Sequence, residues 1–204
     1  MKEENYTLYA ILFFFALAIV LIIIIQNSSK SLEENEKREL DKIREDFIKS
    51  IESRGFFISK EICFHKLSIF VDDTNKNWTL NFPPIGGMPA QPPIFAYSQL
   101  IEFEIKENGE QIAQGRAGSA LLGGLFLGTA GAIAGASKTQ KTKNFATLEL
   151  CITVNDIDSN SYRIYLVKDV EISTYNGKQL YERAKTFAQQ VVSLFSYIQK
   201  NETC

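Results

Sequence analysis

The chain has 204 residues, a length that allows one domain with accessory segments or two small domains. Hydrophobic residues make up 45% of it and charged residues 23%, which excludes both a disordered tail and a polytopic transporter. The 22 basic and 24 acidic side chains leave a formal net charge of −2, so the chain has no global positive field to hold nucleic acid. Three widely spaced cysteines and a single histidine form neither a disulfide framework nor a zinc motif.

An uncharged apolar stretch lies near the N-terminus, at residues 6–25. Its twenty residues match the length that a helix needs to cross the roughly 30 Å hydrocarbon core of a bilayer. A cleaved signal peptide would have a basic start, a shorter apolar region and a small-residue cleavage site, whereas here two glutamates follow Lys2 and the apolar run is too long. The sequence therefore predicts a transmembrane anchor over residues 1–27.

Basic residues are distributed unequally around this anchor. Only Lys2 precedes the apolar stretch, and the basic residues that follow it closely are Lys30, Lys37, Arg38, Lys42 and Arg44. Because Lys and Arg favour the cytoplasmic side of a membrane, we expect a single-pass protein of the cell membrane whose C-terminal domain is cytoplasmic. The unpaired cysteines agree with such a reducing compartment.

Residues 28–55 are predicted to form a helical stalk. Ser31 begins a capping box, apolar residues then recur every three or four positions, and Gly55 is a suitable stop. The apolar spacing leaves two interpretations open, self-association of the stalk and packing on the chain's own domain.

Beyond Gly55 the apolar spacing changes from that of a helix to the alternation of β-strands. Short strands are predicted over residues 57–64, 67–71, 78–82, 94–97, 100–105, 111–114, 146–154 and 162–167. Asn108-Gly109 is a strong hairpin signal, and the Pro-rich loop at residues 83–93 can be neither helix nor central strand. The segment from Gly177 to Lys200 is amphipathic and predicts a helix that closes an antiparallel barrel or sandwich, an α+β fold.

Four stretches of the chain carry a resemblance to a known family: IFVDDTNKNWTL, IFAYSQLIEFEIKENGEQIAQGRAG, the glycine-rich run after it, and TLELCITVND. They resemble a bacterial pleckstrin-homology-like (PH-like) domain, a bent antiparallel sheet closed by a C-terminal helix. More narrowly, they resemble uncharacterised, often prophage-associated bacterial membrane proteins with a glycine-rich insertion. The resemblance covers residues 56–200 and implies a fold and an adaptor-like role, with no reaction. The oligomerising tail of some members has no counterpart after Ile198.

The glycine-rich insertion occupies residues 115–143, and its stretch 117–137 carries no charge. Its glycine-zipper spacing, which lets helix backbones approach closely, is formed by Gly124, Gly128, Gly131 and Gly135. Because the strands on both sides of the insertion should belong to one sheet, the chain has to return to the side of the membrane from which it left. Each arm of a hairpin would have about ten residues, or about 15 Å of helix, so we expect a shallow re-entrant hairpin or one packed against a partner. A flexible loop that covers the sheet is the alternative.

Three lysines follow the uncharged stretch: Lys138, Lys141 and Lys143. They would suit the headgroups of an anionic leaflet, and a solvated basic turn is an equally open interpretation. The nearby run GAIAGASKT lacks the Gly-Lys-Ser/Thr ending of a phosphate loop, which argues against nucleotide binding.

The sequence holds no catalytic or metal-binding constellation. Neither a Gly-x-Ser-x-Gly elbow nor a His-Glu-x-x-His motif is present. The residues that could carry chemistry have plainer interpretations: structural for His65, turn-forming for Asp72 and Asp73, and core packing for Trp78. We therefore expect no enzymatic activity, no cofactor and no metal.

Two hypotheses about function follow. The first is a non-enzymatic, membrane-anchored cytoplasmic adaptor that binds a protein or lipid headgroup, with the bilayer and a protein partner or second copy as its partners. From the prophage character of the resemblance we expect interference at the membrane with the entry of another phage. The second hypothesis is a membrane-permeabilising or oligomeric pore protein driven by the glycine-rich hairpin.

Overall fold

The computed structural model describes residues 34–35, 37–81, 92–115, 144–157 and 160–202. The chain divides into two compact units, residues 1–48 and residues 49–204. In the first unit the described residues are helical, and Arg38 pairs with Glu34 one turn away at 3.8 Å. Both side chains are largely exposed, so this pair adds little stability.

Several predicted features lie outside the described residues. They are the anchor over residues 1–27, the capping box at Ser31, most of the Pro-rich loop and nearly all of the glycine-rich insertion. Within the part of the chain that the structure describes, no helix combines the length and the apolar character needed to cross a membrane.

The predicted helix stop at Gly55 is confirmed. Gly55 has a φ of 80°, a left-handed conformation that glycine adopts at little cost. The backbone N–H of Gly55 donates to the carbonyl of Glu52 at 2.9 Å, and that of Phe56 donates to Ile51 at 3.2 Å. This is the hydrogen-bond pattern of a Schellman motif, and the side chains of Ile51 and Phe56 are both buried, as the motif favours.

The first four strands form one antiparallel sheet, here called sheet A, in the order β1-β2-β3-β4. Its strands are β1 (Lys60–Phe64), β2 (Leu67–Asp72), β3 (Asn77–Asn81) and β4 (Phe95–Ala96). The first strand begins later than predicted. The backbone N–H of Phe57 donates to the Asp72 carboxylate at 2.9 Å, so Asp72 fixes the chain ahead of β1 through a side chain rather than a strand partner.

The remaining strands form a second antiparallel sheet, sheet B, in the order β6-β5-β7-β8. A short 3₁₀ helix, η1 (Tyr97–Gln99), leads into these strands, which are β5 (Leu100–Glu107), β6 (Glu110–Gly115), β7 (Phe145–Val154) and β8 (Ser161–Glu171). Asn108 and Gly109 form the predicted two-residue turn, with φ angles of 52° and 85°. The described strands thus form two separate antiparallel sheets rather than the closed barrel that was one of the two predicted forms.

One helix, α3 (Tyr175–Lys200), follows sheet B and begins two residues earlier than predicted. The Thr174 hydroxyl caps it by accepting a hydrogen bond from the backbone N–H of Gly177 at 3.1 Å. Only glycine fits at position 177, because a Cβ there would overlap the carbonyl oxygen of Glu171. Of the predicted apolar stripe, Leu180 is only half-buried, and the other members are buried: Ala184, Phe187, Ala188, Val191, Leu194, Phe195 and Ile198. Tyr181 and Val192, which were not part of the predicted stripe, are buried as well.

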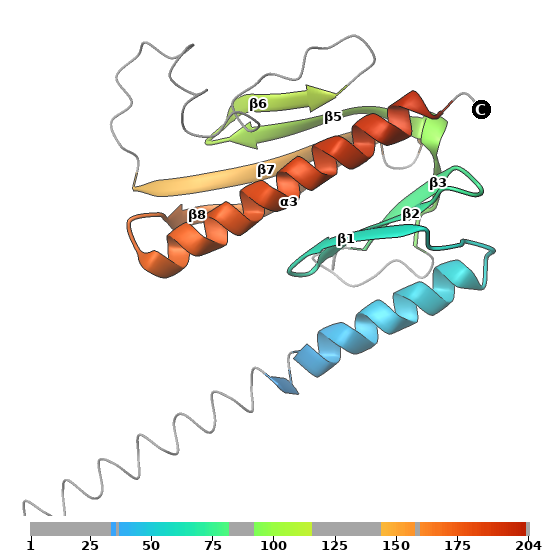
Figure 1. Ribbon diagram of the computed structural model, residues 1–204, viewed down its shortest axis with the longest axis horizontal. Helices are drawn as coiled ribbons and strands as arrows, with labels where there is room; N and C mark the ends of the chain where they lie inside the picture. The colour runs from blue at the N-terminus through green and yellow to red at the C-terminus, as the bar shows by residue number, and fades with distance from the viewer. Residues whose placement is uncertain (1–33, 36, 82–91, 116–143, 158–159, 203–204) are drawn as a thin grey trace, which may run out of the picture. The chain divides into compact units, whose positions relative to one another are not determined.

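An aromatic seam joins α3 to both sheets. The ring of Phe195 lies 5.2 Å from that of Trp78 on β3 and 5.4 Å from that of Phe103 on β5. Trp78 also contacts Phe95 on β4 at 4.9 Å, and none of these four side chains is more than 1% exposed. Figure 1 shows α3 running along sheet B with β1 to β3 beside the same helix. The predicted core position of Trp78 is confirmed.

The turn between β2 and β3 is organised by the buried carboxylate of Asp72. It accepts hydrogen bonds from the backbone N–H groups of Phe57 and Asn75, both at 2.9 Å, and from the Asn75 side chain at 2.7 Å. Burial raises the pKa of Asp72, but these hydrogen bonds outweigh burial and hold the pKa below its usual value. The predicted turn-forming role of Asp72 is confirmed.

Replacing Phe195 by alanine should lower the free energy of unfolding by about 3–5 kcal/mol, because it removes a buried ring that contacts both Trp78 of sheet A and Phe103 of sheet B. Urea unfolding of the full chain measures this, with the fluorescence of Trp78, the only tryptophan, as the signal. Gln190→Ala, at an exposed position of the same helix, is the matched control and should cost less than about 0.5 kcal/mol. Equal losses of unfolding free energy in the two variants would contradict the stabilising role of the seam.

Asp72→Asn should lower the free energy of unfolding at neutral pH by about 1–3 kcal/mol, because the charge-assisted hydrogen bonds are lost. The folded-state pKa of Asp72 lies below its unfolded value of about 3.9, so its stabilisation is present above that pH and is lost as the pH falls through the folded pKa. The gap between native chain and variant should therefore shrink below about pH 4. Urea titrations across this range measure the gap, and a gap independent of pH would show that the charge plays no part.

Candidate functional site

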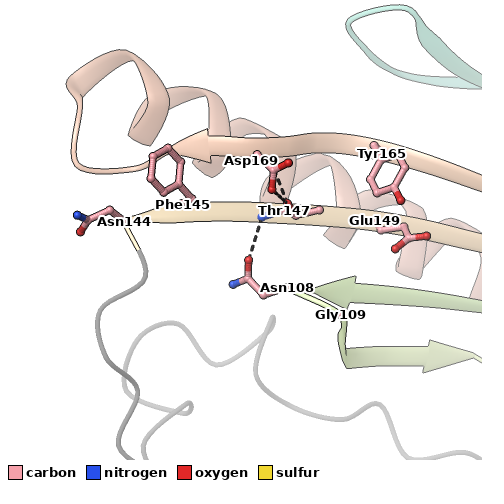
Figure 2. A pocket seen from close by; sticks show the side chains of 8 residues that line it. All are labelled: Asn108, Gly109, Asn144, Phe145, Thr147, Glu149, Tyr165 and Asp169. Carbon is pink, nitrogen blue, oxygen red and sulfur yellow. Dashed lines mark hydrogen bonds between the residues drawn. The ribbon is translucent and has the colours of Figure 1, made fainter.

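An open depression of about 580 Å³ lies at one end of sheet B. The β5–β6 turn, the first residues of β7 and the second half of β8 surround it (Figure 2). We call it the sheet-end depression, and its lining residues are Asn108, Gly109, Asn144, Phe145, Thr147, Glu149, Tyr165 and Asp169.

A β-bulge in β8 shapes the floor of this depression. Ala146 pairs with Val170 and Leu148 with Val167, so β8 carries one more residue than β7 opposite Thr147. The extra residue places Asp169 in a left-handed conformation, with a φ of 49°, which aspartate tolerates better than most residues.

Thr147 holds the bulge in place through both its backbone and its side chain. Its hydroxyl accepts a hydrogen bond from the backbone N–H of Asp169 at 3.0 Å and donates to the Asp169 carboxylate at 3.1 Å. Its backbone N–H donates to the side-chain oxygen of Asn108 at 3.0 Å, as the dashed lines of Figure 2 trace. One threonine thus ties β8 to the β5–β6 turn across β7.

Glu149 forms the more enclosed part of the lining. Its carboxylate lies 2.8 Å from the Nε of Arg163 and accepts a hydrogen bond from the Cys151 thiol at 3.6 Å, and its side chain is only 12% exposed. Burial, followed by the negative charge of Glu149, raises the pKa of the Cys151 thiol. The thiol therefore stays protonated at neutral pH, which makes it a poor nucleophile.

Two exposed aromatic side chains flank these polar groups. Phe145 is 54% exposed and Tyr165 is 46% exposed, and the ammonium group of Lys168 lies 5.2 Å from the centre of the Tyr165 ring. Among the described residues, Asp169 has no ion-pair partner. The depression thus offers aromatic faces and carboxylates, which suits the binding of a cationic group rather than a reaction.

The insertion leaves sheet B at Gly115, which is held tightly. The carbonyl of Gly115 accepts a hydrogen bond from the side chain of Gln199, near the end of α3, at 3.2 Å. A Cβ at this position would overlap the ring of Phe103, so only glycine lets Phe103 reach the aromatic seam.

The insertion rejoins sheet B at Asn144, at the other end of the sheet. The carbonyl of Asn144 accepts a hydrogen bond from the backbone N–H of Ile172, just ahead of α3, at 2.8 Å. Phe103 pairs with both Gly115 and Ile152, and Asn144 lies eight residues before Ile152 on its strand. At about 3.3 Å per residue, the two ends of the insertion are about 26 Å apart along the sheet. Both flanking strands belong to one sheet, as predicted.

Residues 56–168, more than half of the chain, match the sequence model of a family described as a glycine zipper containing PH domain. The chain belongs to this family. The match supports the PH-like fold and the glycine zipper that the sequence predicted, and it ends within β8, ahead of α3. The bacterial and prophage setting stays a prediction. No curated protein and no solved structure matches this glycine-zipper PH domain chain.

The predicted site residues of the glycine-zipper PH domain lie outside the described residues. They are the zipper glycines Gly124, Gly128, Gly131 and Gly135 and the lysines Lys138, Lys141 and Lys143. In the described ranges, no three His, Cys, Asp or Glu side chains gather closely enough to hold a metal ion.

His65 and Asp73 both lie in turns, away from the sheet-end depression. His65 occupies the β1–β2 turn with a φ of 51°, and its ring packs edge-on against Phe64 at 4.5 Å. Burial, followed by the positive charge of Arg183, lowers the pKa of His65. Asp73 accepts hydrogen bonds from Lys76 and Tyr197, each at 2.9 Å, which ties the β2–β3 turn to α3.

Sequence reasoning missed the sheet-end depression itself. The Asn108-Gly109 turn was found, but the bulge at Asp169 depends on the register between β7 and β8, which no local pattern reveals. One signal was available in the sequence. The large apolar Phe145 precedes Ala146, the first residue of the buried face of β7, so the alternation of the strand places Phe145 on the exposed face.

Proposed function

We propose that this glycine-zipper PH domain protein is a non-enzymatic, membrane-anchored adaptor whose domain lies on the cytoplasmic side and binds a protein partner. The observation that carries the proposal is the uncharged stretch of twenty apolar residues at positions 6–25, placed ahead of the PH domain match. A chain anchored in this way keeps its domain at the membrane.

The chemistry of the described surface supports binding. In the sheet-end depression, the carboxylate of Glu149 is paired with Arg163, and beside it the thiol of Cys151 stays protonated. Its exposed groups include the aromatic rings of Phe145 and Tyr165 and the side chain of Asp169. Exposed aromatic side chains beside polar groups are typical of surfaces that bind other proteins.

A second candidate function, an oligomeric pore, is favoured by the zipper that the family match includes. Small residues at four-residue spacing let helices of several copies pack closely within a bilayer. The two proposals assign different roles to the zipper. In the adaptor it packs against the bilayer surface or a partner, whereas in the pore it forms the interface between copies of the chain.

The orientation of the domain can be tested with its own thiol. In the variant Cys151→Ser/Cys204→Ser, the exposed Cys63 on β1 is the only reporter. A membrane-impermeant maleimide should leave this variant unlabelled in intact cells and label it after permeabilisation, and deletion of residues 1–27 should release the chain into the soluble fraction.

Lys2→Cys in a background without the three native cysteines is the matched control for labelling, because it should react from outside. Labelling of Cys63 in intact cells would overturn the cytoplasmic assignment. Recovery of the full chain in the soluble fraction would overturn the anchor.

Leucine in place of the four zipper glycines separates the adaptor from the pore. An adaptor should stay in the membrane fraction through residues 6–25 and show no change in ion permeability. A pore should lose both permeability and oligomers, which dye-release from vesicles and cross-linking measure. Alanine at the same four positions is the control, because its small side chain preserves most of the close approach.

A further inference from the structure

The β2–β3 turn, residues 72–76, holds the chain where it leaves the helix that ends at Gly55. The side-chain amide of Asn75 donates to the carbonyl of Gly55 at 3.1 Å. Two residues further on, the backbone N–H of Phe57 donates to the Asp72 carboxylate at 2.9 Å. These two hydrogen bonds fasten residues 55–57, here called the helix exit, to the turn.

The same turn holds the C-terminal end of α3 through Asp73. Its Oδ1 atom accepts hydrogen bonds from the ammonium group of Lys76 and from the hydroxyl of Tyr197, each at 2.9 Å. The hydroxyl of Tyr97 on η1 donates to the same oxygen at 3.3 Å. The hydrogen bond from Lys76, followed by that from Tyr197, holds the pKa of Asp73 below its usual value. Asp73 is therefore ionised at neutral pH, and the turn, η1 and α3 meet at one charged oxygen.

One backbone conformation serves both sides of the turn. The backbone N–H of Asn75 donates to the Asp72 carboxylate at 2.9 Å, and its side-chain amide donates to that carboxylate at 2.7 Å. The next residue, Lys76, is left-handed with a φ of 55°, and its carbonyl accepts the backbone N–H of Tyr97 at 2.8 Å. A residue other than glycine keeps such a conformation only while its surroundings impose it. Loss of the Asn75 side chain therefore releases the helix exit and also relaxes the backbone that carries Asp73.

The last turn of α3, residues 197–200, makes a second contact close to that of Tyr197. The side-chain amide of Gln199 donates to the carbonyls of Ile101 and Gly115, each at 3.2 Å. Gly115 is the last described residue ahead of the glycine-rich insertion. The final turn of a helix has no further turn to pair with its carbonyls, so its order depends on side-chain contacts of this kind. When this turn frays, the contacts of Tyr197 and Gln199 are lost together.

We propose that the β2–β3 turn is a conformational relay between the helix exit and the last turn of α3. Release of the helix exit from Asn75 loosens the Asp73 oxygen that holds Tyr197, and the loosened turn of α3 loses its hold on Gly115. A load on the stalk thereby changes how firmly sheet B holds the strand end from which the insertion leaves. All of these contacts lie among the described residues, and the relay operates whether or not the chain is anchored in a membrane.

Hydrogen exchange of the full chain tests the relay with Asn75→Ala, because the Asn75 side chain bonds to Gly55 and Asp72 rather than to α3. The amides of residues 199–201 exchange through local fraying, so a loss of global stability alone leaves their rates unchanged. The relay predicts exchange that is about three- to tenfold faster at these amides, as expected for the loss of about one hydrogen bond. Unchanged rates there would overturn the relay. Faster exchange there with unchanged exchange at residues 113–115 would overturn its link to the insertion.

Tyr197→Phe gives the reciprocal test. It removes a single exposed hydroxyl, so the fold is retained. Because coupling between two contacts is reciprocal, this variant should speed exchange of the Phe57 amide by a similar factor. At residues 199–201, the effects of Tyr197→Phe and Asn75→Ala should fall short of multiplying in the double variant, because both open the same contact. Effects that multiply fully would show two independent contacts and would overturn the relay.

Tyr175→Phe is the matched control at the other end of α3. It removes the acceptor of the hydrogen bond that Gln179 donates to an exposed tyrosine at 2.6 Å. The control should leave the exchange of the Phe57 amide unchanged. If it speeds that exchange as much as Tyr197→Phe does, the effect belongs to α3 in general and the relay is excluded.

Discussion

The contact of Phe195 with both Trp78 and Phe103 is the interaction on which the rest of the domain depends. Trp78 belongs to sheet A and Phe103 to sheet B, and α3 supplies a ring that contacts both of these buried side chains. Aromatic pairs at such distances contribute roughly 0.5–1.5 kcal/mol each beyond the burial of their apolar area. Because no strand pairing joins the two sheets among the described residues, the seam, the short η1 link and contacts such as that of Phe95 with Tyr162 hold them in place.

The seam also fixes where the insertion leaves the domain. The Phe103 ring, already held by Phe195, occupies the space that a side chain at Gly115 would need. Gln199, one helical turn beyond Phe195, bonds to the carbonyl of Gly115, and the other end of the insertion bonds just ahead of α3. Thus α3 holds one end of the glycine-rich insertion, and the turn that leads into α3 holds the other, which connects core packing to the segment on which both proposed functions depend.

Much of the fold followed from local patterns. The alternation along β7, the Asn108-Gly109 turn, the glycine stop at Gly55 and the apolar stripe of α3 each depend on a few neighbouring residues, so the sequence was enough to predict them. The glycine zipper was recognised by spacing alone, and the family match supports it. The sheet-end depression could not be predicted, because it arises where a bulge in β8 opposite Thr147 brings residues of β7, β8 and the β5–β6 turn together.

Native-state hydrogen exchange tests the central claim, that one seam holds the two sheets together, most directly. If the seam at Phe195 unites them, the slowest amides of β2 and β3 in sheet A and of β5 and β7 in sheet B should exchange through one global opening of equal free energy. Denaturant should then lower that free energy with the same slope in both sheets. If sheet A exchanges through an opening of clearly lower free energy while sheet B stays protected, the sheets are independent units and the account is contradicted.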